Sequence, residues 1–445
     1  MFVFTKSLVL ALLPIALGSP VNNLGSFLTL RSPTNPIHER DNSFVWASVG
    51  DSWAAGVSYS TTQHTDYDGD KNHCHRWKDS YGPIMERDNT WTTGVQKFNF
   101  AACSAARLVN IVADAQGENP AQMDLVGNPQ MITYHAGGND CGFGAVVADC
   151  IYQPDLSSYG PEYPDPAGRC AQQLAGRNKY IDQEGEGGLY QDELKTVVEM
   201  LRHPAVKDNK NFRLYILGYA HFFNLGANYC DDISFGAVPL IGNKPKVSNR
   251  LRTDLNDGVE RVNKILARVA NDVGDARVKY LDISPAFNGH RFCEDHHSYK
   301  DQWYSTDVWL WNLNTPADDP PADPTLMDAW LNAGQLPDGT TVTSYPDGTM
   351  IGVELQGGVE TDGSGGSTGE GPTWHQRPFH PKHGGTHAIA DIIIAQAKAD
   401  KIPGVVGSSP PTMGTCDCNE SGCSPGSPAC CANGTCWYRI PVSMF

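Results

Sequence analysis

Apolar positions along the chain fall into two alternating patterns. Short apolar runs of strand length end abruptly in small or polar residues, as buried strands of a parallel sheet do. These runs are Phe44–Val49, Phe98–Ala102, Met131–Ala136, Phe212–Tyr219 and Val278–Ile283. Helical patterns cover Leu189–Leu201 and Leu251–Val273, and a last helix over Thr386–Ala399 follows Gly384 and Gly385. Strands that alternate with helices predict an α/β fold, with a parallel sheet covered by helices on both faces.

The two ends of the chain have a different character from this main body. A lysine and an apolar run from Leu8 to Leu17 predict a secretory signal peptide that ends at Gly18. The run is too short for a bilayer span, which needs roughly 20 residues, so we expect a secreted, extracellular protein without an integral membrane segment. The expected divisions are a signal peptide over 1–18, a propeptide or arm over 19–42, a main domain over 43–403 with a loop insertion over 312–371, a linker over 404–415 and a cysteine-rich tail over 416–445.

Charge narrows the range of partners. The chain has 33 Lys and Arg against 50 Asp and Glu, a net charge of −17 with neutral histidines. An acidic surface repels phosphate backbones and anionic bilayers, so we expect no nucleic-acid partner and no docking on acidic membranes. Hydrophobic residues make up 40% of the chain, which excludes wholesale disorder. We expect a monomer.

Thirteen cysteines indicate disulfides in an oxidising compartment. The main body holds an odd number, so one thiol there is unpaired or pairs outside its group. The tail holds six between Cys416 and Cys436, and is too small for a hydrophobic core without about three disulfides. It also contains two N-glycosylation acceptors, Asn419 and Asn433. Polysaccharide binding and protection of the C-terminus are both open roles for it.

Three polar positions stand where predicted strands end or the last helix begins. Gly50 and Asp51 end the first strand, and Ser52 follows at the start of a helix, at the sheet edge where open α/β folds bind ligands. Taken alone, Ser52 is more often an ordinary helix cap. Gly138 and Asn139 follow the third strand, where an amide N–H can face an oxyanion, although a simple turn also fits.

The third position is a histidine in a proline-rich loop. His380 lies between Pro378 and Pro381, after Arg377, which is an unusual setting for a core residue. A rigid loop of this kind can present an imidazole base to a serine.

Four blocks in this order resemble the SGNH (GDSL-type) hydrolase superfamily. Ser52 matches its first block, Ala102-Cys103-Ser104-Ala105 its second, Asn139 its third and His380 its fifth. Two further stretches, 218–220 and 287–293, resemble its secreted microbial esterase and lipase branch, and the likeness covers about residues 43–403. Several blocks in order are far more specific than one.

The resemblance implies a flavodoxin-like three-layer α/β/α sandwich that hydrolyses esters through an acyl-serine. Ser52 would be the nucleophile and His380 the base. The oxyanion hole would use the N–H groups of Ser52 and Ala105 and the side chain of Asn139, with Gly50, Asp51, Gly138 and Arg377 in support. It implies no cofactor and no metal.

Two positions depart from the family pattern. Ala105 replaces a usual glycine, so a left-handed backbone there would be strained. Arg377 stands three residues before His380, where the family has its acid, so we expect a Ser–His dyad whose Nδ1–H is held by a backbone carbonyl of this loop. Glu370 and Asp362 are poor candidates for an orienting acid.

The same resemblance implies three disulfides, Cys74–Cys103, Cys150–Cys170 and Cys230–Cys293. Cys141 would then be the odd thiol, with a Cys141–Cys150 pair as the alternative.

Other histidines and aromatics have more ordinary interpretations. His380, His383 and His387 have metal-ligand spacing, but Pro381 and the two glycines after it disfavour one helix through all three. The pairs His73/His75 and His296/His297 lack a matching partner set and are interpreted as loop residues. For Trp303, Tyr304, Trp309 and Trp311 we favour packing on the core over a substrate wall.

The sequence thus predicts a carboxylic ester hydrolase that acts on a small-molecule or polymeric ester. The substrate is a lipid or other acyl ester, or an acylated plant-wall polymer. The alternative, motivated by Ala105 and the missing acid, is a non-catalytic glycan- or wall-binding protein on the same fold.

Overall fold

The structure is a computed structural model that describes most of the predicted main domain. The described residues are 43–57, 66–69, 72–152, 163, 166–235, 246–299, 301–312, 342–344, 351–353, 378–407, 429–432 and 435–438. The predicted signal peptide and N-terminal arm, together with Arg377, Glu370 and Asp362, lie outside them, as do most of the loop insertion and most of the tail.

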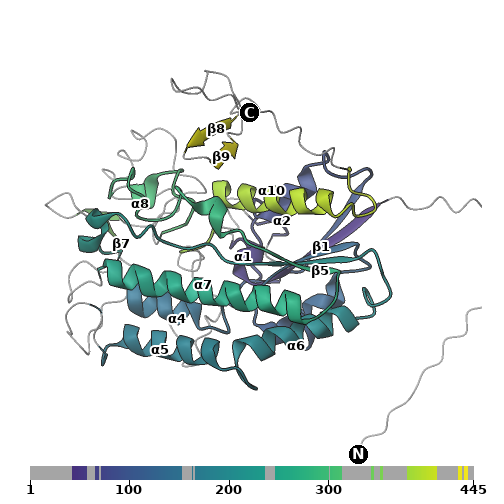
Figure 1. Ribbon diagram of the computed structural model, residues 1–445, viewed down its shortest axis with the longest axis horizontal. Helices are drawn as coiled ribbons and strands as arrows, with labels where there is room; N and C mark the ends of the chain where they lie inside the picture. The colour runs from purple at the N-terminus through teal and green to yellow at the C-terminus, as the bar shows by residue number, and fades with distance from the viewer. Residues whose placement is uncertain are drawn as a thin grey trace, which may run out of the picture. The chain divides into compact units, whose positions relative to one another are not determined.

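A five-stranded parallel sheet forms the centre of the domain (Figure 1). Its strands, in the spatial order β2-β1-β3-β4-β5, are β1 (Phe44–Gly50), β2 (Gln96–Phe100), β3 (Met131–His135), β4 (Arg213–Leu217) and β5 (Val278–Leu281). Each coincides with a predicted apolar run to within a few residues. The three central strands, β1, β3 and β4, are mostly apolar and almost wholly buried because both faces of the sheet are covered, whereas the edge strands β2 and β5 are only partly buried.

Helices cover the two faces. In Figure 1, α10 and α2 lie on one side of the sheet, and α4, α5, α6 and α7 on the other. The helices of more than seven residues are α5 (Arg169–Asp182), α6 (Leu189–Arg202), α7 (Asn249–Asp272) and α10 (His383–Ala399). The shorter ones are α1 (Ser52–Ala55), α2 (Tyr81–Arg87), α3 (Leu108–Val112), α4 (Phe143–Val147) and α8 (Asp301–Tyr304). Single turns are η1 (Gln122–Leu125), η2 (Ala148–Tyr152, a π-helical turn), η3 (Asn228–Asp232) and η4 (Ser284–Phe287). The predicted three-layer α/β/α sandwich is confirmed.

The strand order determines where a site can form. From β1 the chain passes outward to β2 and then returns to β3 on the other side of β1, so the order reverses between β1 and β3. Ligands of open α/β sheets bind beyond the carboxyl ends of strands at such a reversal. Gly50 at the end of β1 pairs with His135 at the end of β3, so the loops that follow these strands start side by side.

Some elements differ from the sequence expectations. Helix α5 was not predicted, because only Leu174 and Ile181 in it are buried and its apolar stripe is thin. Helix α10 begins at His383, so it contains His387 and the glycine pair that was taken to precede it. Within the expected loop insertion, β6 (Val342–Ser344) and β7 (Ile351–Val353) pair antiparallel. In the tail, β8 (Ala429–Ala432) pairs with β9 (Thr435–Tyr438).

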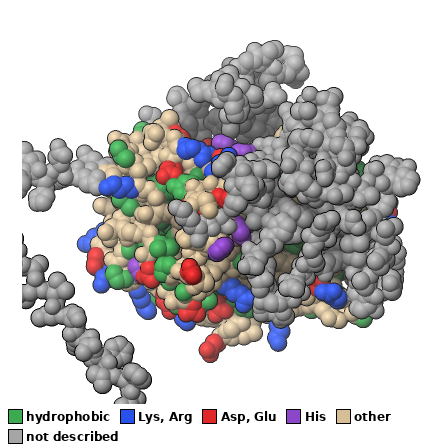
Figure 2. Space-filling model, turned by 180° about the vertical axis from the view of Figure 1, so that it is seen from behind, with side chains coloured by type: hydrophobic (Ala, Val, Ile, Leu, Met, Phe, Trp, Pro, Cys, Tyr) green, Lys and Arg blue, Asp and Glu red, His purple; other side chains and the backbone are tan. Residues whose placement is uncertain are grey.

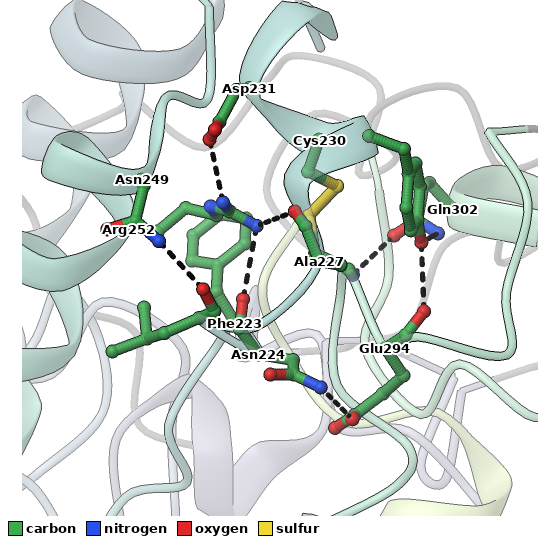
Figure 3. The surroundings of a disulfide bond; sticks show 12 residues. Phe223, Asn224, Ala227, Cys230, Asp231, Asn249, Arg252, Glu294 and Gln302 are labelled. Atoms are coloured by element: carbon green, nitrogen blue, oxygen red, sulfur yellow. Dashed lines mark hydrogen bonds and ion pairs between the residues drawn. A yellow bond between two sulfur atoms is a disulfide. The ribbon is translucent and has the colours of Figure 1, made fainter.

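The three disulfides implied by the resemblance are present. Cys74 bonds Cys103, Cys150 bonds Cys170, and Cys230 bonds Cys293, whose surroundings are drawn in Figure 3. Cys141 is buried and is the unpaired thiol among the described residues. Trp303 and Trp311 are buried, as the packing interpretation expected.

The described surface fits the acidic composition. Acidic and basic side chains are interspersed over the described part of the face in Figure 2, without a broad basic patch. No described helix has the length and apolarity to cross a bilayer.

Candidate active site

The turn after β1 presents Ser52 at the start of helix α1. Asp51 caps this helix, since its Oδ1 accepts a hydrogen bond from the Trp53 N–H at 2.9 Å. Gly50 has a φ of +143°, and a Cβ there would lie 2.1 Å from the carbonyl oxygen of His135 on β3. Only glycine allows the two strands to meet so closely. The sequence Gly50-Asp51-Ser52 therefore fixes the position of the serine hydroxyl.

His380 meets Ser52 directly, although 328 positions separate them. Its Nε2 lies 2.7 Å from Ser52 Oγ, and its Nδ1 lies 3.0 Å from the carbonyl oxygen of Pro378. A carbonyl can only accept, so Nδ1 carries the proton and Nε2 accepts from the serine hydroxyl. The acceptor is a backbone carbonyl of the same loop, as the resemblance implied.

Backbone hydrogen bonds hold the histidine loop in place. The Trp311 N–H donates to the His380 carbonyl at 2.9 Å, and the Phe379 N–H donates to the Trp311 carbonyl at 2.7 Å. His380 itself is only 3% exposed. The imidazole is therefore anchored before substrate arrives.

The three expected oxyanion donors have distinct settings. The Asn139 amide donates to the Ala106 carbonyl at 2.9 Å and lines the same pocket as Ser52. Ala105 has a φ of +63°, the left-handed conformation that glycine would adopt more easily. The backbone N–H groups of Ser52 and Ala105 have no acceptor among the described residues, so they are open to a substrate oxygen.

Tyr219 links the turn that holds Ser52 to the loop after β3, a contact that sequence reasoning missed. Its hydroxyl donates to Asp51 Oδ2 at 2.8 Å and accepts from the Gly138 N–H at 3.1 Å. Burial raises the pKa of Asp51 to about 7. The stretch Gly218-Tyr219-Ala220 had pointed to the family, but only the fold reveals what the phenol contacts.

More buried titratable groups lie behind these loops. The Tyr134 hydroxyl donates to Glu193 Oε2 at 2.7 Å, and burial raises the pKa of Glu193 well above its usual value. A Cβ on Gly137 would lie 2.4 Å from Glu193 Oε1, which explains the first glycine of that loop. Burial, and secondarily the nearby His380, lower the pKa of His135 to about 3. Burial therefore favours the uncharged forms of both Glu193 and His135.

An apolar pocket opens beside Ser52 and Asn139. It runs between helix α7 on one side and α4 with η2 on the other. Its apolar lining includes Phe143, Val146, Val147, Ile151, Val259 and Val262. A pocket with polar groups at one end and apolar walls beyond suits an ester whose acyl part is hydrocarbon.

The chain is similar to secreted lipases of streptomycetes. A lipase of Streptomyces rimosus is 28% identical over 248 residues, which cover 56% of this chain and 73% of that protein. Lipase 1 of Streptomyces coelicolor is 23% identical over 297 residues, 65% of this chain and 78% of that protein. A crystal structure of an extracellular lipase from S. rimosus superposes with a TM-score of 0.42 and 23% identity, covering 61% of this chain and 89% of that one. No family model matches the chain.

These relatives are named lipases, which agrees with the resemblance to SGNH hydrolases that the four ordered blocks carry. The chain is, on this ground, a carboxylic ester hydrolase.

Proposed function

We propose that the protein is a secreted lipase or esterase that cleaves hydrocarbon-chain esters through an acyl-serine on Ser52. The observation that carries the proposal is the 2.7 Å contact between Ser52 Oγ and His380 Nε2 beside an apolar pocket. A nucleophile and a base at this distance, with the base oriented by a third group, form the arrangement that nucleophilic catalysis needs.

The proposed reaction uses the contact between Ser52 Oγ and His380 Nε2. Ser52 Oγ attacks the ester carbonyl carbon while its proton passes to His380 Nε2. The Pro378 carbonyl stabilises the imidazolium through Nδ1–H. When the tetrahedral intermediate collapses, the alcohol leaves with the proton from Nε2. Water then attacks the acyl carbon and gives a proton to Nε2. The second tetrahedral intermediate releases the acid, and the proton on Nε2 returns to Ser52 Oγ.

The oxyanion of the intermediate would be held by the N–H groups of Ser52 and Ala105 and by the Asn139 amide. Each such donor typically contributes about 3–4 kcal/mol to the transition state. The hydrogen bond from Asn139 to the Ala106 carbonyl keeps the amide oriented without using its second N–H. Burial behind these loops raises the pKa of Glu193 and lowers the pKa of His135, so it favours the uncharged form of each beside the oxyanion.

The apolar pocket favours a lipid or other hydrocarbon acyl ester over an acetylated wall polymer. Acetyl groups would leave most of its walls unused, whereas each buried methylene contributes about 0.8 kcal/mol. We therefore expect kcat/KM to rise along acetyl, butanoyl, octanoyl and dodecanoyl esters of p-nitrophenol. Acetylated xylan serves as the competing substrate in the same assay.

The nucleophile is tested by Ser52→Ala and His380→Ala, each expected to lower kcat by at least roughly 10³-fold. The control is His203→Ala, which removes a partly exposed imidazole elsewhere and should leave kcat unchanged. A fluorophosphonate probe should label wild type once and Ser52→Ala not at all. Full activity in Ser52→Ala would refute the proposal, and no labelling of wild type would favour a non-catalytic binding protein.

A further inference from the structure

Three imidazoles converge on one carboxylate in the segment after β5. His296 Nε2 lies 3.1 Å from Asp307 Oδ2, and His297 Nε2 lies 3.0 Å from the same oxygen. His290 Nδ1 lies 2.8 Å from the other oxygen, Oδ1. The sequence shows the adjacent histidines but not their partner, because Asp307 reaches them only through the fold of this segment.

These atoms lie close enough together to surround one metal ion. The two Nε2 atoms and a carboxylate oxygen of Asp307 all lie within 4.8 Å of one another. Zinc bonds imidazole nitrogen and carboxylate oxygen at about 2.0–2.2 Å, so its tetrahedral ligands stand roughly 3.3–3.5 Å apart. Small shifts from 3.0 and 3.1 Å would therefore admit an ion, and neutral imidazole with carboxylate suits zinc.

His290 is placed to orient the ligand Asp307 without binding the metal itself. Its Nδ1 contacts Asp307 Oδ1, so Oδ2 remains directed at His296 and His297. Its ring stacks on Trp309 with a centroid distance of 3.7 Å and an interplanar angle of 1°. Residues that fix the orientation of a metal ligand in this way raise metal affinity.

A disulfide and buried hydrogen bonds tie this segment to the rest of the domain (Figure 3). The Cys230–Cys293 disulfide anchors its start, and the Cys293 N–H donates to Gln302 Oε1 at 2.8 Å. Glu294 is buried and accepts from Asn224 at 2.6 Å. Preorganised ligands lose little conformational entropy on binding, which favours a specific site over casual surface binding.

We propose that His296, His297 and Asp307 bind one zinc ion per chain, with water as a fourth ligand. The ion has a structural role. Asp307 directly precedes the stretch 308–311, whose end pairs with the His380 loop through the Trp311–His380 and Phe379–Trp311 hydrogen bonds. Zinc would therefore join the disulfide-anchored segment to the strand that holds the catalytic imidazole.

The test uses untagged full-length protein, stripped with a chelator and titrated with zinc in a calorimeter. We expect one zinc per chain and a melting temperature that rises with zinc. Cobalt in place of zinc should give the visible absorption of a tetrahedral site. Two variants remove a ligand. His296→Ala should fold because the His296 side chain is 57% exposed. Asp307→Asn keeps the shape of the side chain but removes its charge.

Each of these variants should lose more than roughly 100-fold in zinc affinity, and His290→Ala roughly 10- to 100-fold. His203→Ala, which removes a histidine that contacts Asp124 elsewhere, is the matched control and should bind like wild type. Circular dichroism checks that every variant is folded. The proposal is overturned by wild-type protein that binds no zinc, by Asp307→Asn that binds zinc as wild type does, or by a melting temperature indifferent to zinc.

Discussion

At the scale of single residues, the most unusual group is His135, directly behind the nucleophile turn. Its ring packs against Tyr219 and Trp53, with centroid distances of 4.6 and 5.4 Å. Both ring nitrogens are buried without a hydrogen-bond partner among the described residues. Burial in such surroundings disfavours the second proton that would make the imidazole a cation, and the pKa of His135 is accordingly lowered to about 3.

This burial makes the free energy of unfolding depend on pH. Between pH 6.5 and about 3, His135 is protonated in the unfolded chain but not in the folded chain. Lowering the pH through this range therefore favours unfolding. In His135→Phe an aromatic ring still fills the site, but it has no group that titrates. We expect the free energy of unfolding of the variant, relative to wild type, to rise by about 3 kcal/mol from pH 7 to pH 4.

Urea denaturation of both proteins at several pH values measures this difference. The buried acids, including Asp51 with its pKa raised to about 7, act in the opposite direction in both proteins and cancel in the comparison. A difference that stays constant across this pH range would show that His135 does not titrate as described.

At the scale of elements, the junction of β1 and α1 depends on Gly50. A methyl group there would collide with the His135 carbonyl, in a backbone region nearly restricted to glycine. Gly50→Ala should therefore lower the free energy of unfolding by at least about 3 kcal/mol. Gly69 is the matched control because its φ is also positive, +73°, but nothing lies within 4 Å of a Cβ there.

Gly69→Ala should cost only about 1 kcal/mol, the price of the left-handed backbone alone. Urea titration of the two variants separates the steric contribution from the backbone contribution. Equal losses in both variants would contradict the close approach of β1 and β3.

Helix α7 forms one wall of the apolar pocket, so it should influence which esters are cleaved. Val259→Phe fills the pocket and is expected to lower kcat/KM for dodecanoyl esters at least roughly tenfold, the equivalent of two buried methylenes. Acetyl esters should be hydrolysed as before. Ile265→Phe on the same helix, half-buried outside the pocket lining, is the control and should not alter chain-length preference. Equal effects on both esters would mean that the acyl chain binds elsewhere.

The elements also show which sequence signals were reliable. The sheet strands were predictable because each lies in a short, mostly apolar run that ends in small or polar residues, as strands of a covered parallel sheet do. The start of α10 was placed too late, because Gly384 and Gly385 belong to the helix and are required by its packing. A Cβ on Gly384 would lie 2.2 Å from Trp309, and one on Gly385 would lie 2.8 Å from Phe287. Glycines required by a neighbouring aromatic ring are indistinguishable in sequence from glycines that precede a helix.

At the scale of the whole molecule, the candidate site divides into what local sequence encodes and what only the fold creates. Ser52 and His380 were predictable because both match family blocks in the expected order, although Ser52 taken alone is more often an ordinary helix cap. The Tyr219–Asp51 hydrogen bond and the Asp307 cluster were not, because nothing in the neighbourhood of Tyr219 or Asp307 specifies a partner. Long-range polar contacts depend on how several loops fold together.

The disulfides act on the stability of the entire domain, and their effects should rank by the loops they close. Cys230–Cys293 spans 63 positions and Cys150–Cys170 spans 20. In the chain-entropy account, these crosslinks destabilise the unfolded chain by about 4.3 and 3.3 kcal/mol. Replacing both cysteines of a pair by alanine should therefore cost about 1 kcal/mol more for Cys230–Cys293 than for Cys150–Cys170.

Denaturant unfolding of the two double variants measures this ranking, with zinc excluded by a chelator so that metal binding does not contribute. Cys141→Ala provides the control for loss of a buried sulfur without loss of a crosslink. If loss of Cys150–Cys170 lowers the free energy of unfolding more, the reason lies in the folded state, because that bond joins η2 to α5 at the wall of the apolar pocket. Its loss should then also weaken hydrolysis of long acyl esters. Loss of Cys230–Cys293 should not alter the chain-length preference.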